Sequence, residues 1–209
     1  MFTMRFAGVL VSASLAVALS GCGGETVTGA NRPEPLVANL TDPAAVVSTF
    51  AASLERRDID VYSALLDPAP VGDPNSFRYY PALTDFPWLP DSWDRDTELN
   101  RIAHLCDRTF VSEVTREIVD RIDIDADVLS VEELATSELA VRSTYRAEVL
   151  WAAARGASVD VELEFHLARD RDGFLRIRSI YETLPSGRSS GDEPGIAAMS
   201  WTQLKQMFF

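Results

Sequence analysis

The sequence predicts an α+β fold in which helices cover one face of a strongly bent antiparallel sheet. Two observations carry this prediction. Apolar residues recur every three or four positions up to about residue 110, and they alternate with polar residues from about residue 122 onward. A run of helices followed by a run of strands joined by tight turns is typical of α+β domains.

Three helices are expected at the start of the domain. The segment Thr41-Asp42-Pro43 sets a capping residue before a proline at the first helical position. Asp58 can cap a second, short helix, and Asp67-Pro68 ends it because a proline disfavours helical geometry in the preceding residue. Ser92 or Asp94 caps the third helix. The apolar sides of the three helices consist of Val46, Val47, Phe50 and Leu54, of Val61, Tyr62, Leu65 and Leu66, and of Leu99, Ile102, Leu105 or Cys106, and Phe110.

The segment between the second and third helices, residues 67–91, is a long loop rich in proline and aromatic residues. Its aromatic residues, with the one at position 93, are Phe77, Tyr79, Tyr80, Phe86, Trp88 and Trp93. A brief strand is expected over residues 77–80. The favoured hypothesis is that the loop closes the core with its own rings, because a long ordered loop needs packing. The alternative is a lid over an apolar ligand, which makes Tyr80 and Trp93 candidate pocket residues.

Long strands joined by tight turns form the second half of the domain. In the first three strands the inward positions are Ile122, Ile124, Ala126 and Val128; Val141, Ser143, Tyr145, Ala147, Val149 and Trp151; and Val159, Val161, Leu163, Phe165 and Leu167. The segment Asp170-Arg171-Asp172-Gly173 is a hairpin turn, in which the glycine is free to take a left-handed conformation. In the last strand, residues 174–183, we expect Leu175, Ile177 and Tyr181 to share the buried face.

No motif for a metal or a cofactor stands out. Asp123, Asp125 and Asp127 mimic the start of a calcium-binding loop, but Val128 occupies the position of its glycine and Leu134 that of its bidentate glutamate. The aspartates are better explained as the exposed side of a strand. No histidine–cysteine cluster has the spacing of a zinc site, and no glycine-rich phosphate loop is present. We therefore expect no metal and no cofactor.

The C-terminal region is expected to contain a linker and a short helix. Residues 185–199 are rich in serine and glycine and form the linker. Ser200 then caps an amphipathic helix over residues 200–209, whose apolar side consists of Trp201, Leu204, Met207 and Phe208. We expect this helix to dock on its own domain, since a linker of about 15 residues can reach back. The alternative is that it binds a partner's groove.

The first 21 residues have the features of an export signal. A short basic start at Arg5 precedes the apolar stretch Phe6–Leu19, which is too short to span a membrane and has the length of a signal-peptide core. The run Leu19-Ser20-Gly21-Cys22 resembles the lipobox of bacterial lipoproteins. That resemblance implies cleavage before Cys22, lipidation of its thiol and stable attachment through two or three acyl chains. The alternative is an ordinary cleaved signal peptide with an incidental cysteine.

Lipidation would define the organisation of the mature chain. Residues 22–41 would be a flexible tether between the anchor and a domain at residues 42–184. The residue after the cysteine is Gly23, which resembles outer-membrane sorting in Gram-negative bacteria. We therefore expect an exported, membrane-anchored lipoprotein, in the outer membrane or facing the periplasm if the source is Gram-negative.

Composition excludes one class of partner. The chain carries a net charge of −13 at pH 7, and no basic stripe or base-stacking motif offsets it. An acidic surface repels phosphate backbones, so no nucleic-acid binding is expected. It also repels anionic lipid headgroups, so membrane contact has to come from the lipid anchor. With Cys22 lipidated, Cys106 has no disulfide partner, and such a cysteine in an exported protein is usually buried.

The order of elements resembles the nuclear transport factor 2-like superfamily, which includes ketosteroid isomerase-like and SnoaL-like proteins. The resemblance rests on the helix Val46–Leu54, the stop Leu65–Pro68, the helix Trp93–Phe110 and the hairpin Phe165–Ile177, and it spans residues 42–184. It implies a cone-shaped sheet with the N-terminal helices on its concave face, a ligand pocket at the open end and frequent dimers through the sheet. It implies no single activity, because the fold hosts isomerases, dehydratases and binding modules.

The catalytic members of this superfamily direct an aspartate with a tyrosine, or a histidine with an aspartate, into the cone. His104 and His166 are both expected to face solvent, because each falls off the apolar side of its element. Tyr145 and Tyr181 are expected on the inner faces and complete the set of pocket candidates. No strand carboxylate is expected to point inward beside them, so no catalytic residue is assigned.

The sequence therefore favours a lipid-anchored envelope protein whose domain binds a small apolar molecule or another envelope protein without catalysis. The second hypothesis is an isomerase- or dehydratase-type enzyme that acts on a small apolar substrate with Tyr145 or Tyr181. The third is a structural interaction domain with a filled cone. The interior distinguishes them: a cavity with an acid and a base indicates an enzyme, a dry apolar cavity indicates a ligand binder, and a packed interior leaves the outer surface for function.

Overall fold

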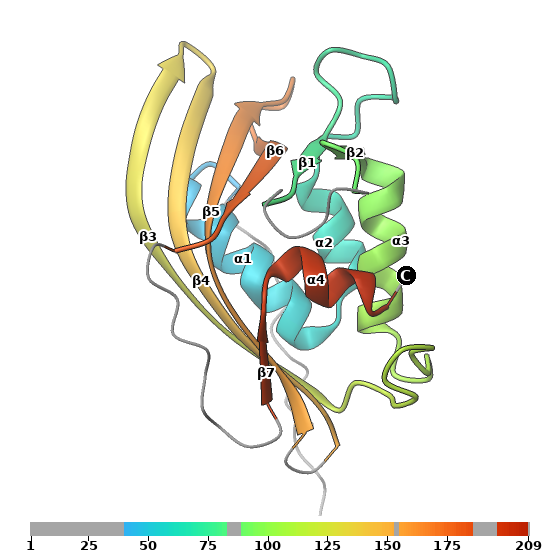
Figure 1. The fold of residues 1–209 in the computed structure, drawn as a ribbon. Coiled ribbons are helices and arrows are strands. Elements are labelled where there is room, and N and C mark those ends of the chain that lie inside the picture. Colours follow the sequence, from blue (N-terminus) through green and yellow to red (C-terminus); the bar gives the residue numbers. More distant parts are fainter. Residues whose placement is uncertain (1–39, 83–88, 153–154, 186–195, 209) are drawn as a thin grey trace, which may run out of the picture. The chain divides into compact units, whose positions relative to one another are not determined.

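The computed structural model describes residues 40–82, 89–152, 155–185 and 196–208, and it confirms the α+β fold. In chain order the elements are α1 (Pro43–Arg56), α2 (Ile59–Leu65), β1 (Arg78–Tyr80), β2 (Trp93–Asp94), α3 (Arg95–Cys106), β3 (Arg121–Ala135), β4 (Glu138–Ala152), β5 (Arg155–Arg169), β6 (Leu175–Thr183), β7 (Ile196–Met199) and α4 (Trp201–Gln206). The sheet curls around the helices, which lie against its concave side (Figure 1). Within the described part of the chain, no helix is long and apolar enough to cross a membrane.

The N-terminal helices begin at the residues that their capping patterns predict. The carboxylate of Asp42 accepts a hydrogen bond from the first turn of α1, and that of Asp58 does the same for α2. Asp94, rather than Ser92, caps α3. This helix ends at Cys106 and is therefore shorter than predicted, because the next residue is already extended. Capping chemistry thus fixes where each helix starts more reliably than periodicity fixes where it ends.

Within the described residues the sheet has seven strands. Six follow the order β2-β1-β6-β5-β4-β3, and β7 pairs with β5. Strands β3 to β6 are antiparallel neighbours, and Gly173 in the turn between β5 and β6 has φ 86°, as its hairpin requires. Strand β1 comes from the aromatic loop and lies parallel to β6. This pairing brings Phe77 and Tyr79 into the core, where both are fully buried, and so supports a loop that closes the core. Phe86 and Trp88 lie outside the described residues.

A β-bulge in β6 reverses the alternation of its side chains. His166 pairs with Ser179 but Leu167 pairs with Ile177, so Arg178 is an extra residue. Because one added residue exchanges the two faces of a strand, the inward positions beyond the bulge are Ile180 and Glu182. The prediction that Tyr181 shares the buried face of Ile177 is therefore wrong. Tyr181 lies on the outer face and is half-buried.

The C-terminal region is more ordered than its composition suggests. Residues 196–199, which the sequence assigns to a linker, form β7 and pair in parallel with Gly156–Val159 of β5. The Ser200 hydroxyl caps α4 and accepts from the Gln203 amide at 3.0 Å, and the Gln203 side chain accepts from the Ser200 amide at 2.6 Å. This capping box starts a short helix that contacts β5 and α3. The predicted docking of the C-terminal helix on its own domain is confirmed.

Candidate functional site

The interior of the curled sheet is filled by the C-terminal helix. Trp201, Leu204 and Phe208 of this segment are at most 1% exposed, and they pack among side chains from the sheet and from α3. The Trp201 ring meets the ring of Tyr145 edge-on, with centroids 5.5 Å apart. The interior therefore holds a segment of the chain itself where the resemblance implies a ligand pocket.

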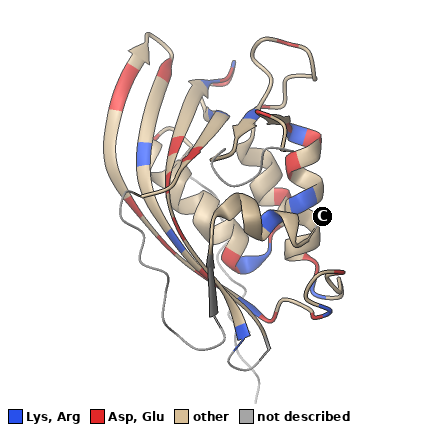
Figure 2. Ribbon diagram, viewed as in Figure 1, with Lys and Arg blue, Asp and Glu red and all other residues tan. Residues whose placement is uncertain are grey.

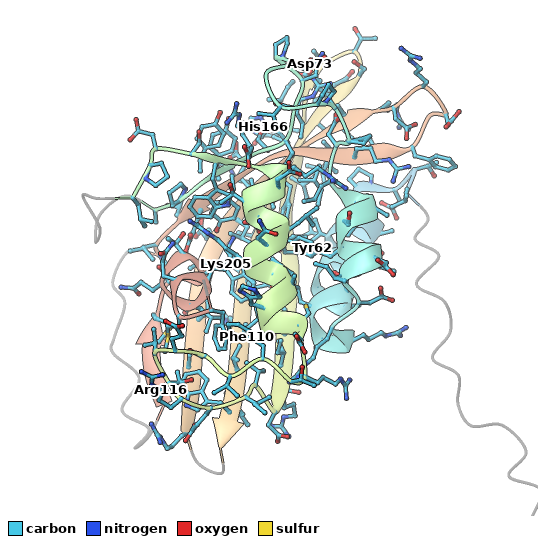
Figure 3. All side chains as sticks on the ribbon, turned by 90° about the vertical axis from the view of Figure 1, so that its right-hand side faces the viewer. Tyr62, Asp73, Phe110, Arg116, His166 and Lys205 are labelled. Carbon is cyan, nitrogen blue, oxygen red and sulfur yellow. The ribbon has the colours of Figure 1, made fainter. Side chains whose placement is uncertain are left out.

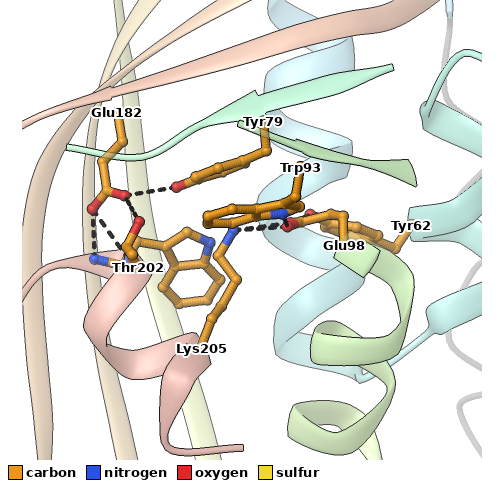
Figure 4. A network of polar contacts seen from close by, with 8 residues as sticks. Tyr62, Tyr79, Trp93, Glu98, Glu182, Thr202 and Lys205 are labelled. Atoms are coloured by element: carbon orange, nitrogen blue, oxygen red, sulfur yellow. Dashed lines mark hydrogen bonds and ion pairs between the residues drawn. The ribbon is translucent and has the colours of Figure 1, made fainter. Parts of the chain in front are cut away.

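A buried ion pair joins α4 to α3 across this interior. Lys205 Nζ lies 3.0 Å from both carboxylate oxygens of Glu98, and both side chains are fully buried (Figure 4). The same carboxylate accepts hydrogen bonds from Tyr62 Oη at 2.6 Å and from Trp93 Nε1 at 2.7 Å. Four donor contacts thus surround one glutamate, which satisfies the requirement that a buried charge be paired and hydrogen-bonded.

Aromatic rings surround the lysine of this pair. Lys205 Nζ lies 3.3 Å from the ring centroid of Tyr79 and 5.1 Å from that of Trp93, and the two rings stack with centroids 4.5 Å apart. A second cation, Arg101, also lies over Trp93, with its guanidinium carbon 4.0 Å from the ring centroid. Burial lowers the pKa of Lys205 to about 8, although Glu98 acts to raise it. The buried ammonium is therefore held by the charge of Glu98 and by the faces of the aromatic rings.

A second buried carboxylate, Glu182 of β6, holds the start of α4. Its Oε2 accepts from Tyr79 Oη at 2.9 Å and also from the Thr202 hydroxyl. Its Oε1 accepts from the amides of Trp201 at 2.8 Å and Thr202 at 3.3 Å. These amides belong to the first turn of α4, which has no carbonyl partners for them, so the carboxylate completes the helix. We call Tyr62, Tyr79, Trp93, Glu98, Glu182, Thr202 and Lys205 the interior network.

The tyrosines of the interior network are fixed as neutral donors. Burial raises the pKa of Tyr79 well above its ordinary value, and the charge of Glu182 adds to this effect. The pKa of Tyr62 is raised in the same way by burial and by Glu98. Each phenol therefore donates to a carboxylate, an arrangement that could move a proton in an accessible site. Here every one of these groups is already engaged with a neighbour of the same chain.

The four pocket candidates separate into two pairs. Trp93 belongs to the interior network, and Tyr145 lies fully buried beside Trp201 with no hydrogen-bond partner for its Oη among the described residues. Tyr80 and Tyr181 instead stack on each other on the outer face, with centroids 4.4 Å apart. The structure therefore brings Trp93 and Tyr145 to the interior and excludes Tyr80 and Tyr181 from it.

Neither histidine reaches the interior network. His166 lies on the outer face of β5, as predicted, but it is half-buried against Tyr181, and its Nε2 is 2.8 Å from Glu164 Oε1. His104 is half-buried rather than solvent-facing, because it stacks on Phe110 and its Nδ1 lies 2.7 Å from the carbonyl oxygen of Phe208. It thus helps hold the end of the chain. Among the described residues, no group of three or more potential ligands could hold a metal ion.

The sequence alone did not predict three main residues of the site, Glu98, Glu182 and Lys205. Glu98 has a detectable signal, since it lies four residues before Ile102 and so shares the buried side of its helix. Lys205 likewise lies four residues after Trp201. Glu182 has no such signal, because only the bulge turns it inward. The expectation that no strand carboxylate points inward is therefore wrong. Cys22 lies outside the described residues.

No protein-family model matches the sequence, and no curated protein matches it. Among solved structures, similarity is found to a proposed dehydratase of the nuclear transport factor 2-like family from Streptomyces avermitilis, with 18% identity, a TM-score of 0.50 and coverage of 68% of this chain and 92% of that chain. A proposed scytalone dehydratase from Novosphingobium aromaticivorans is 12% identical, with a TM-score of 0.51 and coverage of 70% of this chain and 91% of that chain. A nuclear transport factor 2-like superfamily protein from Salmonella enterica is 6% identical, with a TM-score of 0.50 and coverage of 70% of this chain and 91% of that chain. These similarities show the fold, which is nuclear transport factor 2-like.

Proposed function

We propose that this protein is a lipid-anchored cell-envelope protein whose nuclear transport factor 2-like domain binds a partner without catalysis. The observation that carries the proposal is the ion pair of Lys205 with Glu98, fully buried in the interior and 3.0 Å long. A cone that serves as an active site has to admit substrate, whereas this cone is occupied by α4. The outer surface is then the part of the domain available to a small apolar molecule or to another envelope protein.

The filled interior argues against catalysis on energetic grounds. Substrate entry would require α4 to leave, and this would expose Trp201 and Leu204 and break the bonds that Glu182 makes to the first turn of the helix. It would also separate the two buried charges of the ion pair, Lys205 and Glu98, from each other. Such a displacement is expensive because an unpaired buried charge costs several kcal/mol, on the order of 3–5.

The membrane half of the proposal rests on the sequence. A lipid on Cys22 would hold the domain at the membrane, and its acidic surface would keep it from lying on anionic headgroups. The test is Cys22→Ser in the natural host, followed by cell fractionation and by mass measurement of the N-terminal peptide. The expected results are loss of membrane association in the variant and an acylated N-terminus in the wild-type protein. Equal membrane association of both proteins would contradict the anchor.

An enzyme of the isomerase or dehydratase type is the second candidate function. The observation in its favour is the contact of Tyr79 Oη with Glu182 Oε2 at 2.9 Å, because a phenol and a carboxylate could act as acid and base if α4 moved away. Two structurally similar proteins are described as proposed dehydratases, one of them a scytalone dehydratase. Their identities of 18% and 12% transfer only the fold to this chain.

One experiment distinguishes binding from catalysis without knowledge of a substrate. A strain that lacks the gene is complemented with the wild-type protein, with Tyr79→Phe and with Glu182→Gln, and protein levels are checked by immunoblot. These substitutions preserve shape but remove the proton-transfer groups. Full complementation at equal protein level is the result expected for a binding domain, whereas loss of complementation by both variants would favour the enzyme. A dimer through the sheet stays a prediction, and sedimentation equilibrium would give the mass.

A further inference from the structure

A hollow outside the interior network is lined by the C-terminal end of α1, the loop between α3 and β3, and the end of β4. Its volume is about 660 Å³, within the range of small-molecule sites. The residues of its lining that carry the argument are three arginines, Arg57, Arg108 and Arg116, and three apolar residues, Val111, Ile118 and Trp151. Figure 2 shows basic segments from these elements at the lower end of the view, and Figure 3 places Arg116 on the loop below Phe110. None of these residues belongs to the interior network.

The acidic composition of the chain does not account for the grouping of the three arginines, and none of them forms an ion pair with another of the residues that the structure describes. The chain as a whole is acidic, with a net charge of −13, yet these guanidinium groups gather at one hollow. Burial, the largest cause, and the charge of Arg108 both lower the pKa of Arg57, whereas the charge of Asp120 acts to raise it. The two carboxylates at the same hollow are Asp120 and Glu117, and Glu117 is already paired with Arg155 at 2.9 Å. The hollow therefore keeps an excess of positive charge.

Several polar atoms at this hollow lack partners. Arg57 Nη2 and Trp151 Nε1 are buried and make no hydrogen bond within the described part of the chain. Glu117 Oε2 is a buried acceptor in the same condition. Buried donors and acceptors in folded proteins are nearly always paired, and leaving one unpaired is costly. Both nitrogens are themselves buried, so a ligand in the hollow would accept from them only after a side-chain rotation of Arg57 or Trp151.

We propose that this hollow binds a small organic anion. The planar guanidinium groups of Arg57, Arg108 and Arg116 would hold its carboxylate or phosphate group, because a guanidinium forms paired hydrogen bonds with such groups. The indole of Trp151 and the side chain of Ile118 would contact its apolar part. The site is separate from the filled interior, so it needs no movement of α4. It is also independent of the proposed function, whose partner could be of another kind.

The test is calorimetric titration of the purified full-length protein with 2-naphthoate, a flat aromatic carboxylate. One molecule is expected to bind per chain, with an affinity that falls as salt is raised, because the recognition is ionic. The neutral analogue 2-naphthol is expected to bind at least about tenfold more weakly, since it lacks the carboxylate that the arginines recognise. Absence of saturable binding of 2-naphthoate, or equal affinity for 2-naphthol, would overturn the proposal.

Variants of exposed arginines locate the site. Arg108→Glu reverses a charge of the hollow at an exposed position, so it is expected to fold and to weaken binding at least about tenfold. Trp151→Phe keeps the ring and removes the indole nitrogen, and it should weaken binding less. Arg171→Glu, which reverses the charge of an exposed arginine in the hairpin turn, is the matched control and should bind like the wild-type protein. Thermal melting verifies that each variant is folded. Unchanged affinity of folded Arg108→Glu would overturn the assignment to this hollow.

The anion could also be the headgroup of a lipid. Co-sedimentation with vesicles of phosphatidylglycerol, with phosphatidylcholine vesicles as the control, separates the two sources. The proposal of a free small anion expects no binding to either vesicle, because the protein as a whole, with a net charge of −13, is repelled by an anionic membrane. Binding to phosphatidylglycerol vesicles that Arg108→Glu abolishes, together with no binding of 2-naphthoate, would overturn it in favour of a membrane contact.

Discussion

Lys205, near the end of the sequence, contacts Glu98 of α3, and its Nζ lies 3.0 Å from both oxygens of that carboxylate. The two residues belong to helices that contact each other only because β7 returns the chain along β5. Burial of a charge is tolerated here since each partner neutralises the other and Tyr62 and Trp93 complete the hydrogen bonding of the carboxylate. The pair thus connects the C-terminal helix to the N-terminal half of the domain.

Removing one member of this pair is expected to destabilise the protein strongly. Lys205→Met keeps a long unbranched side chain but leaves Glu98 buried without its counter-charge. Glu98→Gln likewise leaves the ammonium of Lys205 buried without a counter-charge. Each change should lower the free energy of unfolding by about 3 kcal/mol or more, whereas the double variant should recover most of this loss. Urea denaturation of the four proteins measures the coupling energy. Additive effects of the two changes would show that the pair is not energetically coupled.

The same lysine should make stability depend on pH. Its pKa is lowered to about 8 by burial, from an ordinary value of 10.5, so between these values the unfolded chain binds a proton that the folded chain does not. The free energy of unfolding should therefore rise with pH in this window, by at most about 1.4 kcal/mol per pH unit. Above pH 10 the buried Tyr62 and Tyr79, whose pKa values are raised, act in the opposite direction.

The measurement for this pH effect compares wild-type protein with Lys205→Met between pH 7.5 and pH 9.5. Titrating groups away from Lys205, among them Cys106 with a pKa raised to about 12, are common to both proteins and cancel in the difference. Glu98 contacts Lys205, so the Lys205→Met, Glu98→Gln double variant serves as a second reference. The wild-type protein should gain stability relative to the variant as the pH rises. A constant difference across the window would mean that Lys205 has the same pKa in the folded and unfolded states.

Two buried tyrosines should respond in opposite ways to loss of the hydroxyl. Tyr145 Oη is buried without a partner among the described residues, so Tyr145→Phe should leave the free energy of unfolding unchanged or raise it by about 1 kcal/mol. Tyr79 donates to Glu182 at 2.9 Å, so Tyr79→Phe should lower it by roughly 1.5–3 kcal/mol. Chemical denaturation checks both. A loss of similar size in the two variants would indicate that Tyr145 also has a partner.

The sequence predicts the elements that depend on local chemistry. Capping at Asp42 and Asp58, the turn glycine Gly173 and the docked helix beginning after Ser200 all follow from neighbouring residues, and the structure agrees with them. The inward carboxylate Glu182 does not follow in this way. Its direction depends on a bulge formed by Arg178, and a bulge is set by pairing between strands rather than by the alternation within one strand.

The site could be predicted only in part for the same reason. Periodicity places Tyr145 inside, since β4 keeps a regular alternation along this segment. It misplaces Tyr181, which lies beyond the bulge, and for Lys205 the four-residue spacing from Trp201 is opposed by the residue type. A lysine near the end of a short amphipathic helix normally faces solvent. Its burial here needs Glu98, which lies far away in the chain and is brought close only by the fold.

The bulge in β6 can be tested by removing its extra residue. Deletion of Arg178 would leave one residue between the inward Ile177 and Ile180, so the strand would alternate strictly with Ile180 and Glu182 still inward. We expect the variant to fold with a loss of about 1–3 kcal/mol, because the core positions and the Glu182 cap of α4 are kept. A loss of more than about 4 kcal/mol would show that the bulge itself is required. The control is Arg178→Ala, which keeps the bulge, removes a half-exposed ion pair with Glu138 and should cost about 1 kcal/mol or less. Circular dichroism melts compare the two.

Cys106 should be chemically inert in the folded protein. The thiol is 7% exposed at the end of α3, and burial raises its pKa to about 12, so almost no thiolate forms near neutral pH. In a Cys22→Ser background, a disulfide reagent such as 5,5′-dithiobis(2-nitrobenzoate) should therefore react at least about a hundredfold more slowly with native protein than with protein in urea. Rapid reaction under native conditions would show that the end of α3 opens readily, and it would contradict a tightly packed interior beside Tyr145.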